Sequence, residues 1–389
     1  MISVNDALAK IEARISVTDN TSVVDLENAL DHILSEDIIS PISMPPFRQS
    51  AMDGYAVKLS GENTFRLIGE IQAGDSANPV LEPGDAVRIF TGAPVPDDAD
   101  AVVMQEHVKG PGVVVEVEIN PGQNIREAGE QIKAGELALK AGSRITPAAV
   151  GYLASLGFSE VSVFVKPRIS IIVTGNELKA PGKELKRGEI YESNAQMLRA
   201  ALLKDGFQRV SIFRVEDNLD STIDSISKAL SDSDIVLLSG GISVGDYDFV
   251  GEALEENEVE EVFYKIRQKP GKPLYLGLTE ENYVFALPGN PASALSCFYI
   301  YVLPAIRKYS GYSKSHLERR LLASENEYQK KGDRAQFLKA HAGNSRVVIL
   351  DGHASSMIHS FSMANALVFL PEDQNEVKKG DKVQVVILP

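Results

Sequence analysis

The feature that most constrains this chain is an apolar run, residues 235–238, with a glycine-rich loop after it. Four apolar residues without alternation are too few for a helix and are typical of a strand buried on both faces of a parallel sheet. In the loop, Gly240, Gly241 and Gly245 remove side chains where backbone N–H groups approach a ligand closely. Residues 249–257 predict a short helix. The loop would face its positive end, a usual place for a phosphate.

Two acids, Asp246 and Asp248, end this loop. Carboxylates beside a phosphate need a cation between them, and Mg²⁺ is the usual one. The alternative is a glycine-rich turn with two solvated acids. The loop alone does not decide between them.

Bulk composition narrows the function classes. The chain has 389 residues, which suggests several domains, and its net charge of −15 argues against a general nucleic-acid binder. We expect no membrane span, no signal peptide and a cytoplasmic protein. The single cysteine, Cys297, fits a reducing compartment and lies in an apolar run, which favours a buried structural thiol over a nucleophile. A basic cluster at 265–272 has four cations and no acid, which suits a small polyanion.

The N-terminal third predicts helices around a β domain. Apolar spacing predicts helices over 3–15 and 25–34, and Thr146-Pro147 begins a third helix over 148–156. Between them, 42–131 has short β runs bounded by Gly and Pro turns. We expect this β domain to be an insertion in a discontinuous elongated helical domain formed by 1–41 and 132–165.

The rest of the chain predicts two further domains. Over 166–312, strands and helices alternate, which predicts a doubly wound α/β domain whose strand-end loops meet at one edge. The short β runs of 313–389 predict a small β-barrel. The α/β edge would bring together Thr174–Glu177, Asp217 and Pro288–Ser293.

That edge has the residues needed to bind a phosphoanhydride. Glu177, Asp217 and Asp248 would hold Mg²⁺, and Lys265 and Lys269 would place positive charge on a second or developing anion. Each has a simpler alternative: Glu177 as a helix cap, Asp217 as a turn residue, the lysines as a solvated face. These alternatives weaken jointly because all five residues fall in loops of one predicted edge.

Six stretches, in this order, resemble the molybdopterin molybdenumtransferases of the MoeA type, which are similar also to the gephyrin E domain. They are SAMDGYA at 50–56, IFTGAP at 89–94, TGNE at 174–177, SGGISVG at 239–245, KPGKP at 269–273 and PGNPAS at 288–293. The resemblance covers essentially the whole chain. It implies the four domains delimited above, with an α/β domain similar to MoaB and MogA.

The resemblance also implies an activity. Family members take adenylylated molybdopterin and molybdate, insert the metal at the dithiolene sulfurs and release AMP with Mg²⁺ present. They are homodimers, so Asp53 and Thr91 would reach the α/β cleft of the partner subunit. Other enzymes of molybdenum cofactor biosynthesis are further expected partners; a nucleic acid and a membrane are not.

The residue roles implied by motif fall into three groups. The catalytic and metal-binding residues would be Asp53, Thr91, Glu177, Asp217, Asp248, Lys265 and Lys269, with Glu177, Asp217 and Asp248 on Mg²⁺. The residues that bind the pterin nucleotide would be Thr174, Gly175, Asn194, Ser239, Gly240, Gly241, Ser243, Gly245, Pro288, Gly289, Asn290 and Pro291. The residues that bind molybdate would be Lys269, Pro270, Ser293, Arg334 and Ser356, with Ser355 as the alternative to Ser356.

The chain departs from the family pattern at two positions. Many relatives have an acid where this chain has Asn176 and Gln131. Two alternative functions stay open: the adenylyltransferase that makes the adenylylated pterin, and a gephyrin-like scaffold dimer. An α/β domain of about 150 to 200 residues would be enough for the first, and the second would be favoured by long linkers. Molybdate and tungstate share charge and shape, so sequence does not separate them.

Overall fold

The computed structural model describes residues 1–110, 112–242 and 249–389, and the predicted site residues Ser243, Gly245 and Asp248, with Asp246, lie outside the described residues. The chain divides into two compact units, one of Met1–Val23, Asp31–Ser35 and Ser162–Pro389, the other of Val24–Leu30 and Glu36–Val161. Within the described ranges, no helix combines the length and the apolar character that a bilayer crossing requires.

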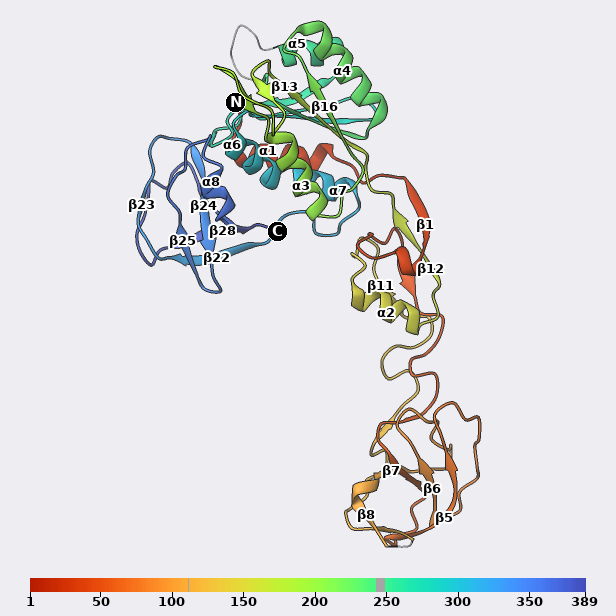
Figure 1. Ribbon diagram of the computed structural model, residues 1–389. Helices are drawn as coiled ribbons and strands as arrows, with labels where there is room; N and C mark the ends of the chain where they lie inside the picture. The colour runs from red at the N-terminus through yellow and green to blue at the C-terminus, as the bar shows by residue number, and fades with distance from the viewer. Residues whose placement is uncertain (111, 243–248) are drawn as a thin grey trace. The chain divides into compact units, whose positions relative to one another are not determined.

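The first unit contains the predicted doubly wound α/β fold (Figure 1). Its six-stranded sheet has the order β16 (Val210–Val215), β13 (Ile169–Thr174), β17 (Ile235–Ser239), β21 (Tyr283–Leu287), β20 (Tyr275–Leu278), β18 (Glu260–Tyr264). The first four strands are parallel to one another, β20 is antiparallel to β21, and β18 is antiparallel to β20. All residues of β13 and β17 are buried, as their continuous apolar runs predict.

Helices cover both faces of this sheet. One face packs against α1 (Val4–Arg14), α3 (Asn194–Lys204), α6 (Pro291–Cys297) and α7 (Leu303–Tyr309), with a π-helical turn, Phe298–Val302, between the last two. The other packs against α4 (Leu219–Asp232) and α5 (Phe249–Glu256). Consecutive residues of β13 point to opposite faces, so Ile171 joins the first core and Ile172 the second.

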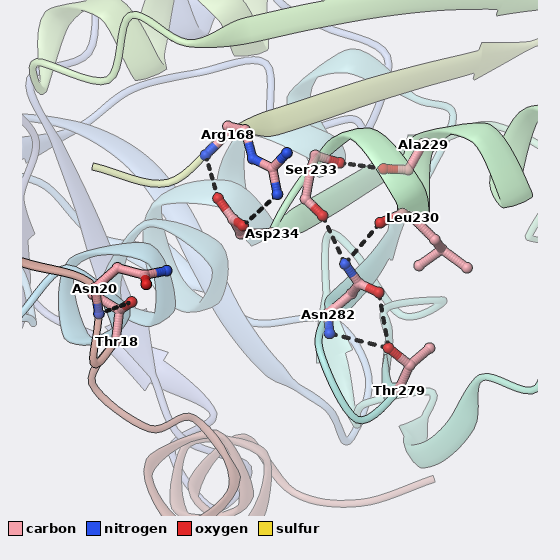
Figure 2. A network of polar contacts seen from close by, with 9 residues as sticks. All are labelled: Thr18, Asn20, Arg168, Ala229, Leu230, Ser233, Asp234, Thr279 and Asn282. Atoms are coloured by element: carbon pink, nitrogen blue, oxygen red, sulfur yellow. Dashed lines mark hydrogen bonds and ion pairs between the residues drawn. The ribbon is translucent and has the colours of Figure 1, made fainter. Parts of the chain in front are cut away.

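Polar contacts join the beginnings of three parallel strands (Figure 2). Arg168, before β13, donates from its main-chain N and its Nη2 to the carboxylate of Asp234, before β17, at 2.7 and 3.0 Å. Asn282, before β21, donates from Nδ2 to the carbonyls of Leu230 and Ser233 at 3.0 and 2.6 Å. The network aligns the strands at the end opposite to their carboxyl termini.

The C-terminal part of the first unit is the predicted β-barrel. The strands β22 (Arg319–Ser324), β24 (Ala335–Ala342), β25 (Arg346–Ile349), β26 (Ala366–Leu370) and β28 (Lys382–Ile387) pair in the order β24, β25, β22, β28, β26, and β26 returns to β24. Beside them lie the pair β23 (Tyr328–Gln329) with β27 (Glu376–Val377) and the helix α8 (His359–Ser362). A short strand of the α/β part, β19 (Gln268–Lys269), pairs in parallel with β24. This pairing, which was not predicted from the sequence, joins the α/β part to the barrel.

The second unit is mostly β structure. Its main sheet has the order β7 (Ala101–Met104), β4 (Gly54–Val57), β6 (Asp85–Ile89), β5 (Thr64–Ile71), β9 (Val113–Val115), β8 (Val108–Lys109). Two small pairs, β3 (Gln49–Ser50) with β10 (Ile125–Arg126) and β2 (Ile38–Ile39) with β11 (Leu137–Leu139), follow. The helix α2 (Pro147–Ser155) begins at Thr146, whose side chain accepts from Ala149 N, as predicted.

The predicted helix over 25–34 is wrong. This segment contains the end of strand β1 (Thr21–Asp25), which pairs with β12 (Glu160–Phe164), and the 3₁₀ turn Leu26–Asn28. Asp31 has a φ of 64°, a left-handed conformation that ends a helix. The apolar residues Leu26, Ala29 and Ile33 are still buried, so their spacing indicated burial and not a helix.

Candidate functional site

A cavity of about 720 Å³ lies in the first unit where the parallel strands end. The loops after β13, β17 and β21 line it, together with residues at the start of α3, the turn around β19 and two segments of the barrel. The structure brings together there these residues of the predicted set: Thr174, Gly175, Glu177, Asn194, Asp217, Ser239, Gly240, Gly241, Lys269, Pro270, Pro288, Gly289, Asn290, Pro291, Ser293, Arg334 and Ser356.

Among the predicted residues that the structure describes, three are not in the lining of the cavity. Lys265 is half-buried, with its Nζ over the ring of Tyr264 at 4.2 Å from the centroid. Asp53 and Thr91 belong to the second unit. There the Asp53 carboxylate accepts hydrogen bonds from Thr91 N and Oγ1, both at 2.7 Å, and these bonds lower its pKa. These two exposed residues therefore form one polar surface site.

Two carboxylates of the cavity influence each other. The pKa of Asp217 is raised, first by burial and then by the negative charge of Glu177. The predicted departure Asn176 lies beside them, and its Oδ1 accepts a hydrogen bond from Asp217 N at 3.1 Å. An amide oxygen is thus sufficient to hold the Asp217 loop. Two close carboxylates suit a divalent cation, although the described residues contain no cluster of three or more His, Cys, Asp or Glu arranged as metal ligands.

Cationic side chains line the cavity, among them Lys269 from β19 and Arg334 from just before β24. Lys269 follows Gln268, whose buried side chain donates to Gly271 O at 3.2 Å and accepts from Tyr301 Oη. Arg334, just before β24, donates from Nη1 to Gln268 O at 3.2 Å. The β19–β24 pairing therefore fixes Lys269 and Arg334 in one part of the cavity. Gln268 was not predicted from the sequence, because its neighbours are set by a non-local strand pairing.

The barrel supplies a loop, Gly352–Met357, that brings Ser355 and Ser356 to the cavity. Buried Lys339 donates from Nζ to Gly352 O at 2.6 Å and to Met357 O at 2.8 Å, so one ammonium group binds both ends of the loop. Ala292 N donates to Ser355 O at 3.1 Å, which attaches the loop to the α6 segment. The loop is therefore held from the barrel and from the α/β part.

Glycine is required at two positions of the cavity. Gly240 has a φ of 100°, and a Cβ there would lie 2.8 Å from Thr174 O. Gly271 has a φ of 88°, and its Cβ would lie 2.4 Å from Cys297 Sγ. Cys297 is fully buried, and burial raises the pKa of its thiol, as expected for a structural thiol.

Three family models match nearly the whole chain. The model of the MoeA N-terminal region (domain I and II) matches residues 2–157, that of a probable molybdopterin binding domain matches 170–308, and that of the MoeA C-terminal region (domain IV) matches 323–388. The middle match contains most of the cavity, and the third contains Arg334 and Ser356.

Named relatives agree with these matches. The chain is 33% identical to a molybdopterin molybdenumtransferase of Staphylococcus epidermidis over 99% of this chain and 95% of that protein. It is 34% identical to one of Haemophilus influenzae over 99% and 98%. Among solved structures, a molybdopterin biosynthesis MoeA protein of Pyrococcus horikoshii superimposes with a TM-score of 0.87 at 29% identity, covering 100% of both chains. By its sequence and its fold, this chain belongs to the MoeA family of molybdopterin molybdenumtransferases.

Proposed function

We propose that this chain inserts molybdate into adenylylated molybdopterin and releases AMP, a step of molybdenum cofactor biosynthesis, in the cytoplasm. The observation that carries the proposal is the cavity of the first unit, where cationic Lys269 and Arg334 share one space with the acidic pair Glu177 and Asp217. A substrate with a phosphoanhydride and a second, separate oxyanion needs both kinds of site. The relatives with this activity by name align over 99% of the chain.

The molybdate end would be formed by Lys269, Pro270, Ser293, Arg334 and Ser356. Lys269 supplies a compact point charge and Arg334 a planar set of donors, and both suit a tetrahedral dianion. The loop Gly352–Met357, held by Lys339, would place Ser356 against the oxygens. A rigid set of donors stabilises the anion without reorganising when it binds.

The opposite end would hold the pterin nucleotide and Mg²⁺. Glu177 and Asp217, with Asp248 as the third ligand, would bind the cation, which neutralises phosphate charge when it is bound. The raised pKa of Asp217 supports this, since it is caused first by burial of the carboxylate and then by the negative charge of Glu177, and a bound cation would offset both. Backbone N–H groups at Gly241 and Gly289 would face the phosphates, and Gly240 leaves no room for a side chain beside them.

The second unit would act across a dimer. In the proposed homodimer, Asp53 and Thr91 complete the cavity of the partner subunit. Their hydrogen bonds fix the Asp53 carboxylate on the surface of the second unit, as a residue that acts on another chain requires. We also propose the four domains at the boundaries predicted from sequence, and other enzymes of the same biosynthesis as further partners. The adenylyltransferase and scaffold alternatives are not favoured, because the MoeA N-terminal and C-terminal matches flank the molybdopterin-binding match.

The test is AMP release from adenylylated molybdopterin with Mg²⁺, measured with and without molybdate. We expect release that depends on molybdate, and a loss of at least about 10²-fold in Lys269→Ala, since one lost electrostatic contact to a reacting group costs this much. Lys314→Ala, an exposed lysine away from the cavity, is the matched control and should behave like the wild type. Equal AMP release with and without molybdate would rule out the proposed function.

A further inference from the structure

Three buried polar atoms on residues that line the cavity have no hydrogen-bond partner among the described residues. They are Thr174 Oγ1, Glu192 Oε2 and Asn194 Oδ1, on side chains that are 5%, 2% and 9% exposed. All three residues line the same cavity. A buried polar atom without a partner destabilises the free protein, because it has lost its hydrogen bonds to water. Three of them in one place indicate a ligand that supplies the missing bonds.

Glu192 is the most informative of the three, and it was not predicted from the sequence. Its Oε1 accepts a hydrogen bond from Ala195 N at 2.7 Å, in the first turn of α3, whose N-cap residue Ser193 makes no capping hydrogen bond with its side chain. The helix therefore fixes one carboxylate oxygen, Oε1, and the other, Oε2, has no hydrogen-bond partner among the described residues. Glu192 lines both the main cavity and a second, smaller cavity of about 260 Å³.

The orientation of the Asn194 side-chain amide follows from its hydrogen-bond partners. Its Nδ2 donates to Gly289 O at 2.7 Å and to Ser239 Oγ at 2.8 Å. Because a carbonyl oxygen only accepts, the amide group must be oriented with Nδ2 toward Gly289, which leaves Oδ1 as the unpaired atom. Asn194 Oδ1 and Glu192 Oε2 are both acceptors, so a ligand that pairs with them must supply donors.

The two organic halves of the proposed substrate differ in what they can donate. The pyrimidinone edge of a pterin has two adjacent donors, the ring N3–H and the 2-amino group, which match a carboxylate oxygen and a neighbouring acceptor. Adenine has a single amino group flanked by ring nitrogens that only accept, and these would oppose the unpaired oxygens. Building on the proposed function, we propose that Glu192 Oε2 accepts a hydrogen bond from the 2-amino edge of the pterin and so recognises it. Asn194 Oδ1 would be the second acceptor.

The variant Glu192→Gln tests this with little change in structure. Its Oε1 can keep the bond to Ala195 N, while Nε2 replaces the free oxygen and turns an acceptor into a donor. We expect 6-hydroxymethylpterin, followed by its own fluorescence, to bind at least about tenfold more weakly. Glu184→Gln removes the same charge from an exposed position of the same connection and should leave binding unchanged. AMP should bind the Glu192→Gln variant and the wild type equally.

A change on the ligand tests the same contact independently. 6-Hydroxymethyllumazine has a carbonyl oxygen where the pterin has its 2-amino group. We expect the wild type to prefer the pterin and Glu192→Gln to reverse that preference. If Glu192→Gln does not fold, the wild-type preference for the pterin remains the deciding measurement, and equal binding of both rings by the wild type would overturn the inference.

Two further outcomes would also overturn the inference: an unchanged pterin preference in folded Glu192→Gln, or a loss of affinity for AMP instead of the pterin. Molybdate-dependent AMP release by the wild type tests the proposed function separately. An active wild type whose pterin preference does not depend on Glu192 would therefore contradict only this inference.

Discussion

At the residue scale, the two carboxylates of the cavity differ in their surroundings. Glu177 is exposed, whereas Asp217 is half-buried and its pKa is raised by that burial and by Glu177. A raised carboxyl pKa in the folded state means that ionised Asp217 destabilises the free protein at neutral pH. This destabilisation is expected of a site that binds a cation, because the bound cation compensates the negative charge.

The variant Asp217→Asn should separate stability from function. Because the folded pKa of Asp217 is raised, its protonated form favours folding at low pH, and this advantage is lost as pH rises through the folded pKa. Without Mg²⁺ and substrate, we expect the variant to unfold at a higher temperature than the wild type at pH 7. In the activity assay, which contains both, we expect its AMP release to fall by at least about 10²-fold. Thermal unfolding at several pH values measures the first effect. A lower unfolding temperature for Asp217→Asn than for the wild type at pH 7 would contradict this explanation of the Glu177–Asp217 pair.

His353 should make the barrel sensitive to acid. Its ring packs edge-on against Tyr328, with centroids 5.5 Å apart, and burial, followed by the charge of Lys339, lowers its pKa to about 4. The folded protein therefore resists protonation that the unfolded chain accepts near the ordinary value of 6.5. We expect the free energy of unfolding to decrease by about 2 kcal/mol as pH falls from 6.5 to 4, after allowance for partial exposure. Denaturant titrations of wild type and His353→Gln measure this, and equal pH slopes would refute it.

Residue-level roles were only partly predictable from sequence. The glycines and acids at strand ends were visible because their types are unusual after an apolar run. Glu192 was not, because its significance lies in one oxygen that the chain leaves unpaired. The signal that could have found it is an acid just before the polar pair Ser193-Asn194, because a carboxylate can cap the first turn of a helix that begins there.

At the element scale, the parallel strands have different tasks at their two ends. Their carboxyl ends line the cavity, and their beginnings are aligned by the contacts of Arg168, Asp234 and Asn282 (Figure 2). The apolar runs made these strands predictable, because burial on both faces leaves no alternation. The segment 25–34 was not predictable, because a bent chain can bury residues at helical spacing. The β19–β24 pairing was not either, because two-residue strands have no periodicity.

Asn282→Ala tests the strand-start network. Removing the amide leaves the carbonyls of Leu230 and Ser233 without this donor, and the free energy of unfolding should fall by about 1–3 kcal/mol. Because the network lies at the other end of the strands from the cavity, AMP release per folded molecule should be unchanged. Urea unfolding and a normalised activity assay measure both effects. A loss of activity without a loss of stability would show that this end of the sheet has a role in the reaction.

Lys339→Met tests the barrel loop. Without the ammonium group, Gly352 O and Met357 O lose their donor, and Ser356 loses its fixed position. We expect the KM for molybdate to rise about tenfold, because small misplacements of binding groups weaken catalysis strongly. The KM for adenylylated molybdopterin should change much less. Lys339→Arg keeps the charge and the donors and should recover most of the loss; an unchanged KM for molybdate in Lys339→Met would exclude this positioning role.

At the scale of the whole molecule, the chain has two compact units, and the proposed site residues are divided between them. Glu177, Asp217 and Lys269 belong to the first unit and line its cavity, while Asp53 and Thr91 belong to the second. The α/β fold followed by the C-terminal barrel was predictable from changes in hydrophobic periodicity, and the four domains with their boundaries stay a proposal. The joint use of two chains was not, because it came only from the family resemblance, and it stays a proposal.

Subunit mixing tests that proposal. Asp53→Ala and Asp217→Asn should each be inactive, and light scattering should give a mass near twice the 42.2 kDa of one chain. If each cavity uses Asp53 of the partner subunit, mixed dimers contain one intact cavity. An equal, fully exchanged mixture should then recover about a quarter of wild-type activity by symmetry. A monomeric mass, or no recovery in a mixture shown to exchange subunits, would place Asp53 outside the partner's cavity.

If this protein is the proposed transferase, AMP release and metal insertion are two parts of one reaction. The quantity to determine is the amount of molybdenum bound in the pterin product per AMP released, by elemental mass spectrometry after the low-mass products are separated. We expect one molybdenum atom per AMP, with both falling together in Lys269→Ala. AMP released with little or no molybdenum in the pterin would identify a hydrolase of the adenylylated pterin and would contradict the proposed reaction.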